Sequence, residues 1–103
     1  MEIQAQLSED KKVLTLTLLG KFDYTWHQEF QAAYENLSPP PEKVIMDVLE
    51  VISLDSSALG MLLLLRKFCG DDNADIKLIN AKPDIYTLMH SCKFDELFVL
   101  ETL

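Results

Sequence analysis

Basic side chains are scarce in this sequence. It has 9 Lys and Arg residues against 17 Asp and Glu residues, which gives a formal net charge of −8 at pH 7. Nucleic acids and anionic membrane surfaces are bound by clustered positive charge, so this balance argues against both as partners. A protein partner with a basic docking surface agrees better with the composition.

Cysteines are also few, and long apolar runs are missing. Cys69 and Cys92 are far apart in the sequence, and the N-terminus has no secretory signal. We therefore expect two reduced core thiols in a cytoplasmic protein. The longest apolar run, from Ala58 to Leu65, is far shorter than the roughly 20 residues of a membrane span, so we expect no insertion into a membrane.

Length and periodicity predict one small α/β domain over residues 1–103. The hydrophobic content of 49% is enough for one core of modest size. Apolar alternation and short apolar runs predict strands, and apolar positions at helical spacing predict helices. The expected strands are 1–7, 13–19, 43–51 and 76–80, the expected helices are 24–37, 56–69 and 82–92, and a last strand or short helix ends the chain. We expect a mixed sheet of four to five strands, with the helices mainly on one face.

Two adjacent serines, Ser56 and Ser57, stand where the third strand passes into the second helix. Asp55 and both serines are good helix N-caps, so capping alone would explain them. Helix geometry separates the two serines. The core stripe of this helix lies about 180° from Ser56 but only about 80° from Ser57, so Ser56 should face solvent and Ser57 the edge of the core. The stripe comprises Ala58, Met61, Leu62, Leu65, Phe68 and Cys69.

A small apolar patch is expected beside Ser56. Leu59 and Leu63 fall outside the core stripe, within about 60° of Ser56. They lie under another helix or form a docking surface. Gly60 is close to them, and a glycine inside a helix costs roughly 1 kcal/mol relative to alanine, so a close approach at this position is expected.

A phosphate on a serine at this position would change binding more than folding. It would add about −1.5 to −2 charges at the positive end of the helix dipole, which the helix tolerates. A partner that buries the free hydroxyl would have to desolvate or repel the added charge.

The segment VIMDVLEVISLDSSALGMLLLLRK, Val44 to Lys67, resembles the central part of the STAS family, the sulfate transporter and anti-sigma factor antagonist domains. The family has an apolar strand ending in aspartate and then an Asp-Ser-Ser-Gly-Leu-Gly type of motif that opens a helix. GKFD, at Gly20 to Asp23, resembles the family's Gly-x-Leu-Asp turn with Phe22 in place of leucine. KLIN and PDIYTLMHSCKFDELF resemble the last strand and helix, so the resemblance covers nearly the whole chain.

The resemblance implies an anti-sigma factor antagonist that works by partner switching. The family's acceptor serine follows the motif aspartate, which is Ser56 here. The dephosphorylated antagonist binds an anti-sigma factor with serine kinase activity, phosphorylation releases it, and a metal-dependent serine phosphatase resets it. Ala58 replaces the motif's usual glycine, which would enlarge the surface beside Ser56. The expected partner-binding residues are Asp23, Asp55, Ser57, Ala58, Leu59, Gly60 and Leu63, and no cofactor or metal is implied.

Other functions fit the residues less well. A serine hydrolase would need His27 or His90 as a base, but there is no G-x-S-x-G elbow. The two histidines and two cysteines have no paired ligand spacing. A phosphoaspartate receiver using Asp47 or Asp55 would need an acidic pair after an early strand. The stronger alternative is a STAS accessory subunit or scaffold of a membrane transporter or signalling complex that binds without a phosphorylation cycle.

Overall fold

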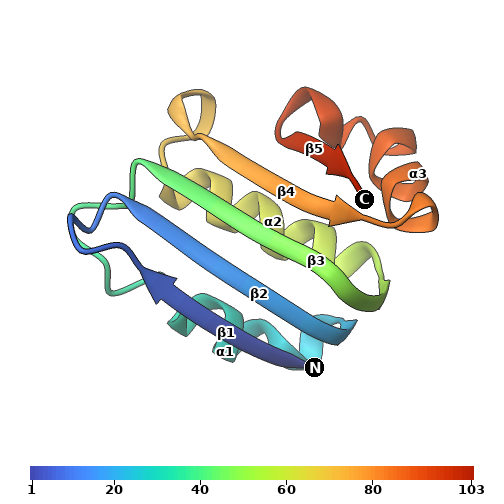
Figure 1. Ribbon diagram of the computed structural model, residues 1–103, viewed down its shortest axis with the longest axis horizontal. Coiled ribbons are helices and arrows are strands. Elements are labelled where there is room, and N and C mark those ends of the chain that lie inside the picture. Colours follow the sequence, from blue (N-terminus) through green and yellow to red (C-terminus); the bar gives the residue numbers. More distant parts are fainter.

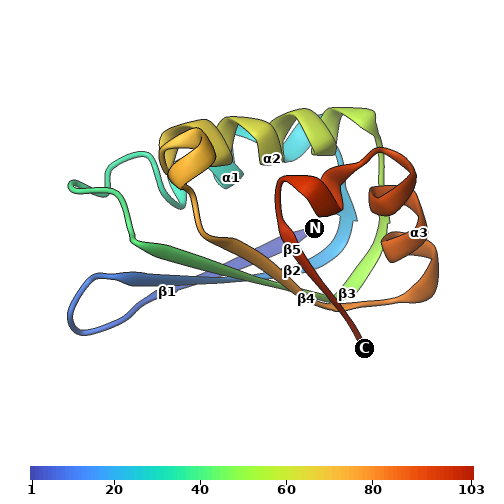
Figure 2. The ribbon, with the colours of Figure 1, turned by 90° about the horizontal axis from the view of Figure 1, so that it is seen from above.

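The computed structural model describes all residues, 1–103, as a five-stranded sheet with helices against one face (Figures 1 and 2). The strands are β1 (Glu2–Leu7), β2 (Val13–Phe22), β3 (Lys43–Leu54), β4 (Ile76–Ala81) and β5 (Val99–Thr102). The helices are α1 (His27–Ala32), α2 (Ser56–Phe68) and α3 (Pro83–Ser91), with short 3-10 turns η1 (Tyr24–Trp26), η2 (Asp71–Asn73) and η3 (Phe94–Glu96).

The sheet is mixed, as expected, and its spatial order follows the chain from β1 to β5. β1 and β2 form an antiparallel hairpin, whereas β2, β3, β4 and β5 pair in parallel. Parallel pairing requires crossover connections, which the helices supply. The carboxyl ends of β2 and β3 therefore lie side by side, because Phe22 is paired with Leu54. No helix is long and apolar enough to cross a membrane.

The core lies between the sheet and the helices. Leu14, Leu16 and Leu18 alternate inward on β2, and Val44 and Met46 do the same on β3. Between these positions lie half-buried residues on the sheet face that no helix covers (Figure 2). This alternation of buried and half-buried residues is the apolar alternation from which the strands are predicted. The buried hydrophobic residues form one cluster of 21, and no charged or polar residue is buried with them.

The first helix is shorter than its periodicity predicts. Only His27–Ala32 is α-helical, and it is preceded by η1. Beyond it, tighter hydrogen bonds such as Tyr34 N to Gln31 O (3.1 Å) are mixed with helical ones such as Glu35 N to Gln31 O (2.9 Å), so the helix ends in turns. This turn brings the Tyr34 ring to 5.1 Å from the ring of Phe68 on α2. Phe30 and Tyr34 are buried as the helical spacing predicts, whereas Tyr24 is exposed, Trp26 is only half-buried and the helix is shorter than predicted.

The second strand is longer than predicted. Gly20, with φ of +101°, was expected to end the strand, but it lies beside a register shift and the strand continues to Phe22. A Cβ atom at this position would lie 3.1 Å from the Cα atom of Met1, so the backbones approach closely here. Glycine therefore produces a bulge in the strand rather than a stop.

Two further expectations concern the end of the chain and the burial of the two cysteines. The last segment contains both η3 and β5, so both alternatives are present in succession. Both cysteines are free. Cys69 is half-buried, and burial raises the pKa of its thiol. Cys92 is exposed at the end of α3, so the expectation of two core thiols is wrong for this residue.

Candidate functional site

The junction of β3 and α2 is organised by Asp55. Its backbone is extended, and its side chain accepts a hydrogen bond from the Ala58 N–H at 3.0 Å. The carbonyl of Asp55 accepts from the Leu59 N–H at 3.3 Å, which starts the helical ladder. Asp55, and neither serine, is therefore the N-cap of α2.

The two serines have different environments. The half-buried Ser57 donates its hydroxyl to the Asp55 carboxylate, with Oγ and Oδ1 2.5 Å apart. Ser56 is exposed, and its side chain makes no hydrogen bond within the chain. The predicted difference in orientation is thus confirmed. Ser57 is engaged in the cap, whereas the Ser56 hydroxyl is free for chemistry or contact.

The same hydrogen bonds stabilise the charge of Asp55. Donation from the Ser57 hydroxyl, followed by donation from the Ala58 N–H, lowers the pKa of the Asp55 carboxyl. Hydrogen bonds to the ionised form favour that form, so Asp55 stays a carboxylate at neutral pH. A permanent negative charge therefore flanks Ser56.

Asp23 lies at the same edge of the sheet as Asp55. Each aspartate directly follows a strand, and the last residues of those strands, Phe22 and Leu54, are register partners. Asp23 caps η1 by accepting from the Thr25 N–H at 3.0 Å, and it also accepts from the Thr25 hydroxyl. Since η1 contacts α2, the structure places Asp23 among the elements that surround the start of that helix.

The outer face of α2 is defined here as Ser56, Gly60, Leu63 and Leu64. All four are exposed, Leu63 by 41% and Leu64 by 59%. Leu64 was not among the expected residues, although it lies only about 80° from Ser56 around the helix. Leu59 is half-buried and packs against the core, so it contributes only part of its side chain to this surface.

Ala58 requires a correction. It was expected to enlarge the surface beside Ser56, but its side chain is 0% exposed and belongs to the core. Position 58 is on the inner stripe of α2, directly over the sheet. Its methyl group therefore fills the core and does not reach a partner.

Gly60 has no internal reason to be glycine. It lies within α2, and a Cβ atom built at this position would meet nothing within 4 Å. The expected close approach does not come from this chain. The absent side chain leaves a flat strip between Ser56 and the two exposed leucines, where another backbone could come near.

A groove between α1 and α2 continues the outer face. It encloses about 190 Å³, less than the roughly 300 Å³ of a small ligand pocket, and it is mainly apolar. Leu64 and Met61 line it from α2, while Tyr24 and His27 line it from the η1 and α1 side. Tyr24 is 60% exposed, and its ring stacks on the His27 ring with centroids 4.1 Å apart. The exposed apolar surface is thus wider than the sequence indicated.

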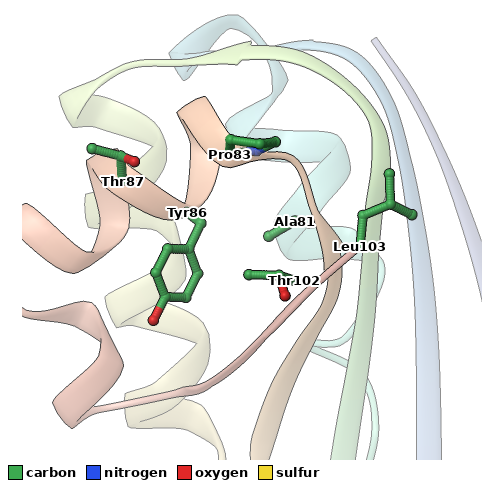
Figure 3. Close-up of a pocket in the computed structure, with 6 residues that line it drawn as sticks. All are labelled: Ala81, Pro83, Tyr86, Thr87, Thr102 and Leu103. Atoms are coloured by element: carbon green, nitrogen blue, oxygen red, sulfur yellow. The ribbon is translucent and has the colours of Figure 1, made fainter.

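A second pocket lies between the end of β4, α3 and the tail of β5 (Figure 3). It encloses about 210 Å³ and is lined by Ala81, Pro83, Tyr86, Thr87, Thr102 and Leu103. Its lining has no carboxylate, amine, imidazole or thiol, so it offers no acid–base pair for catalysis.

The groups considered for catalysis or metal binding are held in other interactions. The Nδ1 atoms of His27 and His90 lie 2.8 Å from the Tyr24 carbonyl and 3.0 Å from the Asp95 carboxylate, so neither nitrogen bonds a serine. Asp47 accepts from the Leu49 N–H and from the Asn80 side chain, at 3.0 and 3.1 Å. No cluster of three or more His, Cys, Asp or Glu side chains is arranged to hold a metal.

Comparison with known proteins agrees with this geometry. A STAS-domain containing protein of Pseudomonas aeruginosa is 42% identical over 98 residues, which cover 95% of this chain and 97% of that protein. An anti-sigma-factor antagonist (STAS) domain protein from Planctomyces limnophilus has the same fold, with a TM-score of 0.75 at 19% identity over 98% of this chain and 90% of that one. The phosphorylated form of the Bacillus cell fate determinant SpoIIAA matches with a TM-score of 0.68 at 14% identity, over 98% of this chain and 92% of that one.

The profile of one protein family spans almost the whole domain. Described as "Mlab, STAS domain", it matches residues 5–101. That range includes β2, β3 and β4, most of the remaining sheet and the Asp55 cap, so the candidate site lies inside it. The chain therefore belongs to the STAS domain family.

Proposed function

We propose that this protein is an anti-sigma factor antagonist that switches partners through phosphorylation of Ser56. With a free Ser56 hydroxyl it binds an anti-sigma factor with serine kinase activity through the outer face of α2. Phosphorylation of Ser56 releases it, and a metal-dependent serine phosphatase restores binding. It acts as a cytoplasmic binding protein and kinase substrate, not as a catalyst.

The observation that carries this proposal is the contrast between the two serines. Ser57 is committed to Asp55, while Ser56 is exposed, unbonded and adjacent to the strip at Gly60. A kinase can approach Ser56 without disturbing the cap of α2, because Asp55 supplies that cap. The fold therefore tolerates modification at the point where a partner would be most sensitive to it.

Electrostatics explain how a phosphate would release a partner. Asp55 and Asp23 already place negative charge at this edge of the sheet, in a chain of net charge −8. A phosphate adds about −1.5 to −2 further charges on the surface that the partner covers. Apolar groups of the partner that pack on Leu63 and Leu64 would have to desolvate this dianion, which opposes binding.

The first test is site-mapped intact mass of the protein purified from its native cell with phosphatase inhibitors present. We expect one phosphate, lost in Ser56→Ala and retained in Ser57→Ala. A phosphate that maps to Ser57, or that persists in Ser56→Ala, contradicts the assignment of the acceptor.

The second test measures binding to the co-purified kinase partner. Ser56→Asp is expected to lower the affinity by at least about tenfold with an unchanged melting temperature, because the added charge is on the outer face and not in the core. Ser53→Asp is the matched control, since Ser53 is also exposed but lies on β3. Equal loss in both variants would indicate a general charge effect and not a switch at Ser56.

The accessory-subunit alternative makes the opposite prediction. A protein that is unmodified in the cell and co-purifies with a membrane ATPase would use the same outer face without a phosphate. Ser56 would then act only as a surface residue beside the cap.

A further inference from the structure

The two edges of the sheet are protected differently. β5 is a short edge strand of four residues, its pairing with β4 is interrupted by a register shift, and Lys77 on β4 pairs with Glu101 on β5 at 3.1 Å. β1 pairs over six consecutive residues with no shift, and it contains neither lysine nor proline. Charges, prolines and bulges are what keep edge strands from pairing with other chains. The β1 edge has few of these protections.

An apolar trough lies directly beside this unprotected edge. It encloses about 610 Å³ between β1 and α1, and Figure 1 shows α1 behind β1 at that side of the sheet. The small side chains of Ala5, Ala32 and Ala33 leave the space, and Ile3 and Trp26 add apolar walls. A strand placed next to β1 would direct alternate side chains into this trough.

The charges around the trough favour a basic segment over a second copy of this chain. The ionisable groups of the trough are the carboxylates of Glu2 and Glu29 and the amino terminus of Met1, and no lysine or arginine side chain lines it. A second copy of this chain would bring a second set of these glutamates to the same edge, between two molecules each of net charge −8. A segment with basic side chains would instead find opposite charges there.

We propose that the β1 edge binds an extended segment of a partner protein, with alternating apolar and basic residues, as a sixth strand. The main chain of the segment completes the hydrogen bonds of β1, and its apolar side chains fill the trough. Its basic side chains point to the other face of the sheet, where Glu2 lies, because successive residues of a strand alternate between the two faces. This is the β-augmentation mode of recognition. The site is separate from the outer face of α2 and does not involve Ser56.

The position of Trp26 allows a direct test. It is the only tryptophan of the chain and lines the trough, so its emission reports occupancy. The probe is a peptide of about eight residues that alternates valine and lysine, long enough to span β1. The control peptide has two central residues replaced by proline, which cannot pair with an edge strand in that register. We expect a saturable blue shift with the first peptide and none with the second.

Matched variants separate the trough from general attraction to an acidic protein. Glu2→Lys should weaken peptide binding about tenfold, because it reverses the charge on the sheet face to which the lysines of the peptide point. Glu35→Lys makes the same change at an exposed residue outside the trough and should change affinity by less than about twofold. Ala5→Phe, at an exposed residue, should fill the trough and block the peptide without unfolding the chain.

Several results would overturn the proposal. These are equal binding of the proline peptide, equal loss in Glu35→Lys, or no shift up to about 1 mM peptide, which would be weaker than ordinary recognition. Concentration-dependent self-association that Ala5→Phe abolishes would show that the occupant is a second copy. Ser56→Asp should bind the peptide like the wild type. Failure of peptide binding would therefore leave the phosphorylation switch untouched, and failure of the switch would leave the peptide site untouched.

Discussion

The two faces of α2 differ in burial: one packs in the core and the other is exposed. The inner face, made of Ala58, Met61, Leu62 and Leu65, is at most 4% exposed and packs in the core. The outer face carries a free hydroxyl, a glycine with open space around it and two exposed leucines. Packing accounts for the residues of the inner face, whereas nothing within the chain accounts for those of the outer face. One helix thus separates the requirements of stability from those of binding.

The largest expected effect comes from adjacent leucines on opposite faces. Leu62→Ala should lower the free energy of unfolding by about 2 to 5 kcal/mol, because it leaves a cavity in the core. Leu63→Ala, the same change one residue later, should cost less than about 1 kcal/mol, since its side chain is 41% exposed. Urea denaturation of both variants measures the difference. Equal destabilisation would mean that the two faces are not separate.

The order should reverse for binding. Leu63→Ala and Leu64→Ala should each weaken the complex with the proposed kinase partner by roughly 1 to 2 kcal/mol, because each removes apolar contact from the outer face. Titration calorimetry with the purified partner measures this, and Ile52→Ala is a suitable control, since Ile52 is an exposed residue of β3. If the Ile52 variant loses as much affinity, the partner contacts β3 and the outer face is wrongly assigned.

Gly60→Ala sharpens the comparison, because its effects on stability and binding should have opposite signs. The new methyl group meets nothing in the chain, so helix propensity should raise stability by up to about 1 kcal/mol. A partner that approaches the glycine closely would lose affinity. Thermal melting measures the change in stability of this variant, and titration with the proposed partner measures the change in its affinity. A stabilised variant with unchanged affinity would remove Gly60 from the binding surface.

The smallest effect concerns the cap between the two faces. Since the folded-state pKa of Asp55 is lowered, its contribution to stability is present above the ordinary aspartate range and is lost as pH falls through the lowered value. Asp55→Asn keeps a capping side chain but has no carboxyl to titrate. We expect its melting temperature to depend less on pH than that of the wild type below about pH 4, by a few degrees at most. If the melting temperatures of the variant and the wild type depend equally on pH, the Asp55 charge has no role in stability.

The sequence predicted this helix well because one period governs it. Ala58, Met61, Leu62 and Leu65 are buried as their spacing indicates, and the difference between Ser56 and Ser57 follows from the same rotation. The mixed sheet, with its helices on one face, could also be inferred from the element order. Leu64 could have been predicted if residues up to about 80° from Ser56 around the helix had been included in the exposed face.

What the sequence could not show depends on contacts between distant segments. The end of α1 at Ala32 depends on how Tyr34 turns to meet Phe68. Gly20 has a bulge conformation because Met1 lies beside it, which no local pattern reveals. The trough combines Ala5 from β1 with Ala32 and Ala33 after a long gap in the chain, and alanines at those positions carry no distinctive signal.

Because the cap of α2 does not involve the Ser56 side chain, position 56 can carry a chemical reporter. A thiol introduced by Ser56→Cys would lie at the positive end of a helix, which lowers a thiol pKa and favours alkylation. Cys69 is half-buried and its pKa is raised by burial, so exposed Cys92 is the main competitor and can be replaced by serine. The rate of alkylation at position 56 would then report whether a partner covers the outer face of α2, because a covered thiol reacts slowly.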